Sequence, residues 1–252
     1  MEGLCNKVPL SFGQKILKIF KVRKKSLITE PTCARLQLKE NGLLNLKQNK
    51  TNKKFIYLIS PNKIENNNFF TNLDLILKNR SVSFFQLRLK KDTNKNKLLI
   101  GKRIKTICKK YKVKFLINDD PILAKKLNAD GCHLGQKDMN ITKARKILTN
   151  KIIGITCHNS IDLAKKAINS GADYLAFGAF YSSKTKKVKY KADLKILRWA
   201  KKITTTPIVA IGGIKLNNYK KLLLNKANFL AISGYIWNNK KYKPLEAIKK
   251  LK

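Results

Sequence analysis

The residues best placed for chemistry are two aspartates, Asp119 and Asp138, each just beyond a short apolar run. The runs are 115–117 and 132–134, and the segment between them, 121–128, has the length of one helix and begins at a proline. A strand, helix and strand in this order make two parallel strands whose C-terminal ends meet at one edge of a sheet. Neighbouring strands lie about 4.8 Å apart, so we expect the two carboxylates to be close together. Carboxylates with nearby amides suit a Mg²⁺ that keeps several waters and is completed by substrate phosphates.

Helix capping is the competing role for the first of these aspartates. Either Asp119 or Asp120 is suitably placed to cap a helix that begins at Pro121. The chain holds only 14 Asp+Glu against 56 Lys+Arg. Two acids at one sheet edge are therefore unusual, and they favour a hard cation held against an anionic substrate.

Gln86, Arg88 and Lys90 alternate along the end of another apolar run, 82–89. Alternation places the three side chains on one face of a strand. Strands of a parallel barrel usually bury continuous apolar runs, so polar residues on an inward face need a partner. An anionic ligand would satisfy them, and a surface edge of the sheet is the alternative.

Three further run ends carry residues that suit phosphate. The segment 178–187 is rich in hydroxyl and ammonium groups and is suited to closing over a diphosphate. Glycines at 212–213 and the pair 233–234 follow the last two runs, which is where barrels usually bind phosphate.

Cys157 and His158 resemble a nucleophile and base, but neighbours in a strand point to opposite faces, which disfavours that pair.

These run ends belong to a regular pattern in which short β-branched or aromatic runs alternate with Lys- and Leu-rich helical segments. The predicted strands are 55–59, 82–89, 114–117, 131–134, 152–156, 174–180, 208–211 and 229–233. Eight such units over about 200 residues indicate an α/β protein. They favour a (β/α)8 TIM barrel over an open doubly wound sheet.

The composition is strongly basic. The formal net charge is +42 over 252 residues, whereas the hydrophobic content of 43% is ordinary. Such a charge attracts polyanions non-specifically. The even spread of Lys and the abundance of Asn favour a biased composition, as an AT-rich genome produces, over a specific nucleic-acid partner.

Residues 1–52 show no periodicity that links them to the rest, so we expect a basic N-terminal extension ahead of a catalytic barrel at 53–252. The stretch 12–25 has the spacing of a basic amphipathic helix, but a loosely ordered extension is the favoured interpretation. Five scattered cysteines without a CxxC pattern indicate a reducing, cytoplasmic setting. No apolar run reaches the ~18 residues of a membrane span, and no signal-peptide core is recognised.

From about residue 55 to 236 the chain resembles the thiamine phosphate synthase family, which shares its barrel with the thiazole tautomerases. The stretches that carry the resemblance are FQLRLK, LINDDPILAKKLNADGCHLGQKDM, IIGITCH, GADYLAFGAFYSSKTK and PIVAIGGI. The resemblance implies a small-molecule reaction. Hydroxymethylpyrimidine diphosphate and thiazole phosphate are joined to thiamine phosphate, with release of pyrophosphate.

The resemblance also implies residue roles. Asp119 and Asp138 match the Mg²⁺ ligands, and the catalytic groups would be Arg88, Thr156 and Lys186. The implied substrate-binding residues are Gln86, Arg88, Lys90, Asn118, Thr156, Ser183, Thr185, Lys186, Gly213, Ser233 and Gly234.

Four positions depart from the family pattern. Leu89 stands where Glu is usual, and Ser182-Ser183 replace Pro-Thr, which makes the loop less rigid and leaves substrate preference open. Gly234 stands where Ser is common, so the role of Ser233 is shifted by one residue.

Two other functions remain open at this point. A thiazole tautomerase on the same barrel would need a general base rather than a metal, and His158 is the candidate. A basic nucleic-acid-binding protein is less favoured, because the sequence lacks clustered aromatic residues interleaved with the lysines for base stacking. The sequence does not indicate an oligomeric state.

Overall fold

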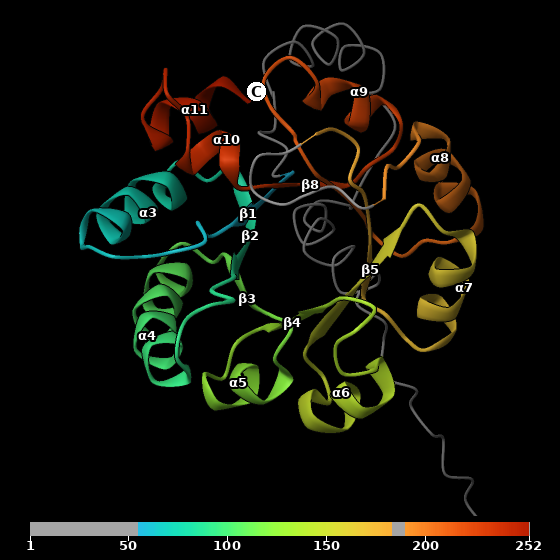
Figure 1. The fold of residues 1–252 in the computed structure, drawn as a ribbon, viewed down its shortest axis with the longest axis horizontal. Coiled ribbons are helices and arrows are strands. Elements are labelled where there is room, and N and C mark those ends of the chain that lie inside the picture. The colour runs from blue at the N-terminus through green and yellow to red at the C-terminus, as the bar shows by residue number, and fades with distance from the viewer. Residues whose placement is uncertain (1–54, 183–189, 252) are drawn as a thin grey trace, which may run out of the picture.

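The computed structural model describes residues 55–182 and 190–251. In these residues eight parallel strands pair in chain order, and β1 (Ile56–Ile59) pairs with β8 (Phe229–Ile232) to close the ring. Helices surround the strands on all sides (Figure 1). The fold is therefore the predicted (β/α)8 TIM barrel. The predicted extension at 1–52 lies outside the described residues.

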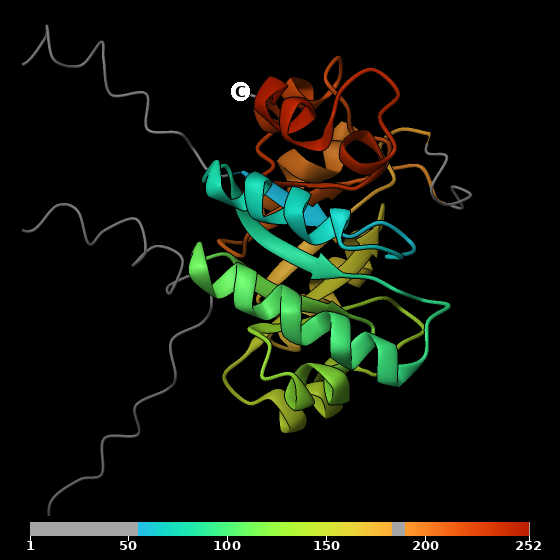
Figure 2. The ribbon, with the colours of Figure 1, turned by 90° about the vertical axis from the view of Figure 1, so that its left-hand side faces the viewer.

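The remaining strands follow the predicted order. They are β2 (Val82–Leu87), β3 (Lys114–Asn118), β4 (Gly131–Leu134), β5 (Ile152–His158), β6 (Tyr174–Phe177) and β7 (Ile208–Ile211). The helices in the described residues are α3 (Asn68–Lys78), α4 (Asn94–Lys110), α5 (Pro121–Lys126), α6 (Ile141–Leu148), α7 (Ile161–Asn169), α8 (Leu194–Ile203), α9 (Tyr219–Leu224), α10 (Gly234–Trp237) and α11 (Pro244–Lys250). Figure 2 shows α3 and α4 side by side on the outside of the barrel. None of these helices has the length and apolar content needed to cross a membrane.

The strands supply two apolar cores, because successive side chains of a strand point to opposite faces. Tyr57, Phe84 and Tyr174 belong to the inner core that fills the barrel. Leu58 and Phe85 belong to the outer core between strands and helices. Because the interior is packed, ligands have access only at an end of the barrel.

Three residues at the N-terminal ends of the strands make equivalent hydrogen bonds. Asp130, Asp173 and Asn228 directly precede β4, β6 and β8. Each side-chain oxygen accepts from a backbone N–H at the start of the strand before. The donors are Phe115 (2.9 Å), Ile153 (2.8 Å) and Ile208 (2.9 Å). We call the end of the barrel where these three residues lie the N-terminal edge. Their side chains pair with amides that would otherwise lack partners.

Asp173 carries a second partner at this edge. Arg145 Nη2 lies 2.6 Å from Asp173 Oδ2, and both side chains are largely buried. The same guanidinium donates to the carbonyls of Thr149 and Gly171 at 2.9 and 3.0 Å. The charge of Asp173 is thus fully paired.

Three predicted strand ends differ from the structure by two or more residues, all at the C-terminal ends. β2 stops at Leu87 rather than at residue 89, and β6 stops at Phe177 rather than at 180. After β6 the amide of Ala179 donates to the carbonyl of Tyr190 and not to a neighbouring strand. β5 instead continues to His158 through a bulge.

Candidate active site

The predicted site residues of β2 to β5 come together at the C-terminal ends of the strands, which we call the mouth. Gln86 and Asn118 lie near the ends of β2 and β3, and Thr156 lies near the end of β5. Asp119 and Asp138 follow β3 and β4. Parallel pairing of adjacent strands brings these positions to one end of the barrel.

Asp119 and Asp120 have different positions and different partners. Asp120 Oδ1 accepts from the amide of Leu123 at 2.9 Å and so caps α5. The backbone of Asp119 has φ 65°, a conformation that costs free energy in a residue with a side chain. Helix capping therefore falls to Asp120, and the carboxylate of Asp119 is left for the mouth.

The carboxyl groups of Asp119 and Asp138 are hydrogen-bonded to each other. Burial, and then the contact with Asp119, raise the pKa of Asp138. Burial also acts to raise the pKa of Asp119, but the Lys90 ammonium and the hydrogen bond from Asp138 outweigh it, so that pKa is lowered. Asp138 therefore keeps its proton to a higher pH and donates it to an ionised Asp119. Two carboxylates this close need added positive charge before both ionise.

This pair fits a cation that takes few protein ligands. Throughout residues 55–182 and 190–251, His, Cys, Asp and Glu side chains form no cluster of three or more that would hold a metal. Two carboxylates with water and phosphate oxygens are the donor set of Mg²⁺. Asp119 and Asp138 are thus the residues that would hold such an ion.

Polar residues from β2 and the loop after it surround this pair. Gln86 is 2% exposed, and its Nε2 donates to Asn118 Oδ1 at 3.1 Å. Lys90 Nζ lies 2.8 Å from Asp119 Oδ2. Arg88 donates to Asn62 Oδ1 at 3.0 Å. Two cations beside a pair of acids favour an anion that binds together with a metal.

The position of Leu89 explains one departure from the family pattern. Leu89 is 4% exposed and belongs to the outer core. An apolar residue suits that environment, whereas Glu there would need a buried partner. Its replacement therefore leaves the polar side of the mouth unchanged.

The glycines after β7 and β8 also lie at the mouth. Gly213 has φ 61°, and a Cβ there would come within 2.3 Å of the carbonyl oxygen of Ser182. Close packing of two loops therefore requires this glycine with or without a phosphate. Ser233 Oγ donates to the carbonyl of Ser60 at 3.0 Å, and Gly234 begins α10. Phosphate binding by these residues stays a prediction. Ser183, Thr185 and Lys186 lie outside the described residues.

His133 was not among the predicted site residues, and it lies inside the barrel beneath the mouth. His133 is 9% exposed, and its Nε2 lies 2.8 Å from Thr156 Oγ1. Its Nδ1 lies 2.8 Å from the hydroxyl of Tyr174, which is 2.8 Å from the hydroxyl of Tyr57. The signal was alternation in β4, where the outer-core residues Cys132 and Leu134 flank His133.

His158 lies at the rim, beside a hollow of about 290 Å³. The residues that line this hollow are Gln136, His158, Asn159, Ser160, Leu163 and Tyr190. The His158 ring packs on the ring of Tyr190 with centroids 4.3 Å apart. Cys157 belongs to the outer core instead, and burial raises the pKa of its thiol to about 12. Cys157 and His158 therefore do not form a nucleophile and base pair.

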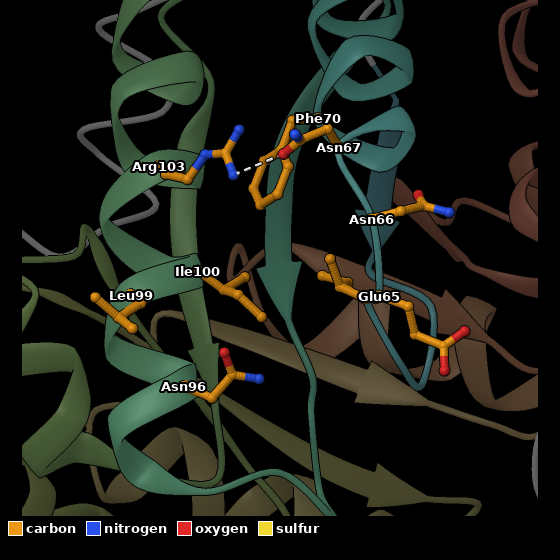
Figure 3. A pocket seen from close by; sticks show the side chains of 9 residues that line it. Glu65, Asn66, Asn67, Phe70, Asn96, Leu99, Ile100 and Arg103 are labelled. Atoms are coloured by element: carbon orange, nitrogen blue, oxygen red, sulfur yellow. Dashed lines mark hydrogen bonds between the residues drawn. The ribbon is translucent and has the colours of Figure 1, made fainter.

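A second hollow, of about 230 Å³, lies between α3 and α4 on the outside of the barrel (Figure 3). The guanidinium of Arg103 lies 3.7 Å from the centroid of the Phe70 ring and donates to Asn67 Oδ1 at 3.0 Å. This arrangement satisfies Arg103 within the protein. The hollow contains none of the residues predicted for the site.

Comparisons with known proteins agree with the resemblance. A family model described as thiamine monophosphate synthase matches residues 56–236. The thiamine-phosphate synthase of Pelagibacter ubique is 78% identical over 207 residues, which cover 82% of this chain and 100% of that protein. The enzyme of the same name from Rhodospirillum centenum is 38% identical and covers 73% of this chain and 89% of its own length.

A solved structure shows the same likeness. The thiamine phosphate pyrophosphorylase from Pyrococcus furiosus superposes with a TM-score of 0.69 at 27% identity. The match covers 79% of this chain and 94% of that chain. It therefore includes nearly the whole of the solved barrel.

Proposed function

The chain belongs to the thiamine monophosphate synthase family and makes thiamine phosphate, and we propose that it does so by a magnesium-dependent displacement at the mouth. The proposed substrates are hydroxymethylpyrimidine diphosphate and thiazole phosphate. The thiazole nitrogen forms the new bond to the pyrimidine methylene carbon as the bond from that carbon to the diphosphate oxygen breaks. Pyrophosphate leaves with the electron pair of that bond.

The observation that carries the proposal is the contact between Asp119 and Asp138, whose carboxyl groups come from the ends of two neighbouring strands. When bound there, Mg²⁺ would stabilise negative charge on the departing pyrophosphate. A bound cation would also lower the pKa of Asp138, so that this residue would lose the proton it donates to Asp119.

The residues around the acids would orient the diphosphate. Lys90 and Arg88 supply positive charge beside Asp119. The Gln86 and Asn118 amides, hydrogen-bonded to each other, would contact the pyrimidine diphosphate. No strong general base is required, because the thiazole nitrogen attacks with a free lone pair.

The phosphate contacts complete the proposal. Gly213 and the pair Ser233 and Gly234 would receive the thiazole phosphate at the ends of β7 and β8. Ser183, Thr185 and Lys186, outside the described residues, would bind phosphates of both substrates, with Lys186 near the leaving group. The partners are small molecules, and a cytoplasmic location belongs to the same proposal.

The test is an assay of the purified chain with both substrates and Mg²⁺, with and without EDTA. We expect thiamine phosphate and pyrophosphate in equal amounts, and loss of both products when EDTA is present. Product formation that is unaffected by EDTA would contradict the metal assignment.

The thiazole tautomerase alternative is tested with the same protein. His158 would be its base, and the imidazole does lie at the mouth, against Tyr190. Family membership and the acid pair favour the synthase. The alternative would be favoured if the unmodified chain showed tautomerase turnover but formed no thiamine phosphate, and if Asp138→Asn kept that turnover.

A further inference from the structure

Four polar groups form a single line of hydrogen bonds from the barrel centre to the mouth. The line runs from the Tyr57 hydroxyl to the Tyr174 hydroxyl, then through the His133 ring to Thr156 Oγ1. Each of the three links is 2.8 Å long. The tyrosines are 2% exposed, whereas Thr156 is partly exposed. One end of the line is therefore closed and the other end is open.

The barrel is built to hold these rings in place. A Cβ on Gly154 would lie 1.8 Å from the Tyr174 ring, so this glycine makes the room for that ring. The rings of His133 and Tyr174 are stacked, with centroids 5.6 Å apart. The ring of Tyr57 packs edge-on against Tyr174 and stacks on Phe84. The hydroxyls are thus fixed by packing as well as by their hydrogen bonds.

The protonation of each group is fixed by burial. Burial raises the pKa of Tyr57 and of Tyr174, so each hydroxyl keeps its proton. The His133 ring is buried and both of its nitrogens meet hydroxyl groups rather than a carboxylate, so a charged ring would lack a counter-charge. The ring is therefore neutral and carries one proton. With the Thr156 hydroxyl, four protons are shared among three links. One proton must therefore point out of the line, at one end or the other.

The closed end decides which proton this is. In residues 55–182 and 190–251, the hydroxyl of Tyr57 has one hydrogen-bond partner, Tyr174. If Tyr57 accepted in that bond, its own proton would be buried without an acceptor, which costs free energy. If Tyr57 donates, Tyr174 must donate to Nδ1 of His133, and Nε2 must carry the ring proton.

We infer that Tyr57, Tyr174 and His133 are positioning residues that fix the direction of the Thr156 hydroxyl. Thr156 Oγ1 accepts from His133 Nε2, and its own proton is left to point into the mouth. The site then offers a donor, which suits the acceptor atoms of a pyrimidine diphosphate. The nature of that acceptor rests on the proposed function, whereas the direction of the line does not.

The first test measures the His133 tautomer by nitrogen NMR of the ligand-free full chain with ¹⁵N-labelled histidine. The chain has two histidines, and His158→Asn identifies the second, because Asn tolerates the φ of 52° at that position. We expect a protonated Nε2 and an unprotonated Nδ1. A protonated Nδ1 would overturn the inference. This outcome is independent of activity, so it is separate from failure of the proposed function.

The second test asks whether the line acts through Thr156. Tyr174→Phe keeps the ring and removes the hydroxyl, and we expect a loss in kcat of roughly tenfold. In a Thr156→Val background the same change should cost less than about twofold, because the hydroxyl that it directs is absent. Equal losses in both backgrounds would show a structural role for Tyr174 and contradict the inference.

Discussion

The two ends of the barrel use the same side chain in opposite ways. At the N-terminal edge, Asp130 and Asp173 each accept from a backbone amide and are paired with a cation. At the mouth, Asp119 and Asp138 contact each other, and Asp119 has an unfavourable φ. Carboxylates at the first end stabilise the fold by pairing with backbone amides and cations. Those at the second end share a proton, and both would ionise only with added positive charge, which is typical of a site that binds a cation.

The largest expected effect is on activity at the mouth. Asp119→Asn keeps the shape of the side chain and tolerates positive φ, but it removes a charge that would hold the metal. We expect kcat to fall by about a hundredfold or more. Urea unfolding should change by less than about 1 kcal/mol, because the Lys90 ion pair is partly exposed. A large loss of stability with normal kcat would show that Asp119 serves the fold rather than activity, contrary to this comparison.

The N-terminal edge should show the opposite result. Asp173→Ala leaves the Ile153 amide and the Arg145 guanidinium without their shared acceptor. We expect a loss in unfolding free energy of about 3 kcal/mol, with kcat of the folded fraction unchanged. Urea unfolding and the synthase assay measure the two quantities. Unchanged stability would mean that this acceptor is not needed.

The pH dependence of stability should depend on the buried His133, beneath the mouth. Its folded pKa of about 4 lies below the unfolded value of about 6.5, so only the unfolded chain binds its proton between these values. Stability is complete above about pH 6.5 and falls as the pH drops toward 4, by up to about 3 kcal/mol from this group. His133→Gln should flatten that slope, measured by urea unfolding at pH 7 and pH 4.5. An unchanged slope would contradict this origin.

Sequence periodicity was sufficient for the barrel because each strand buries a recognisable run. The same pattern placed Asp119 and Asp138 together, since parallel strands end at one edge. It did not separate Asp119 from Asp120, because which of them caps α5 depends on backbone angles that spacing does not specify. His133 was missed because its neighbours in the run are apolar, and its partners Tyr174 and Thr156 are distant in sequence.

The strand ends were the least predictable part. β6 ends early because Ala179 bonds to Tyr190, a contact between a strand end and a returning loop. Such contacts depend on the closed barrel and have no local sequence signal. The same holds for Gly213, which its packing on Ser182 explains as well as a phosphate would.

The most direct measurement compares one isosteric change at the two ends of the barrel. Asp138→Asn and Asp130→Asn would be assayed for thiamine phosphate formation with Mg²⁺ and for urea unfolding. Asn228 accepts the equivalent hydrogen bond from the amide of Ile208. We therefore expect Asp130→Asn to stay active and to lose less than about 1 kcal/mol of unfolding free energy. Asp138→Asn should be folded and inactive. Full magnesium-dependent activity in Asp138→Asn would contradict the assignment of the mouth as the metal site.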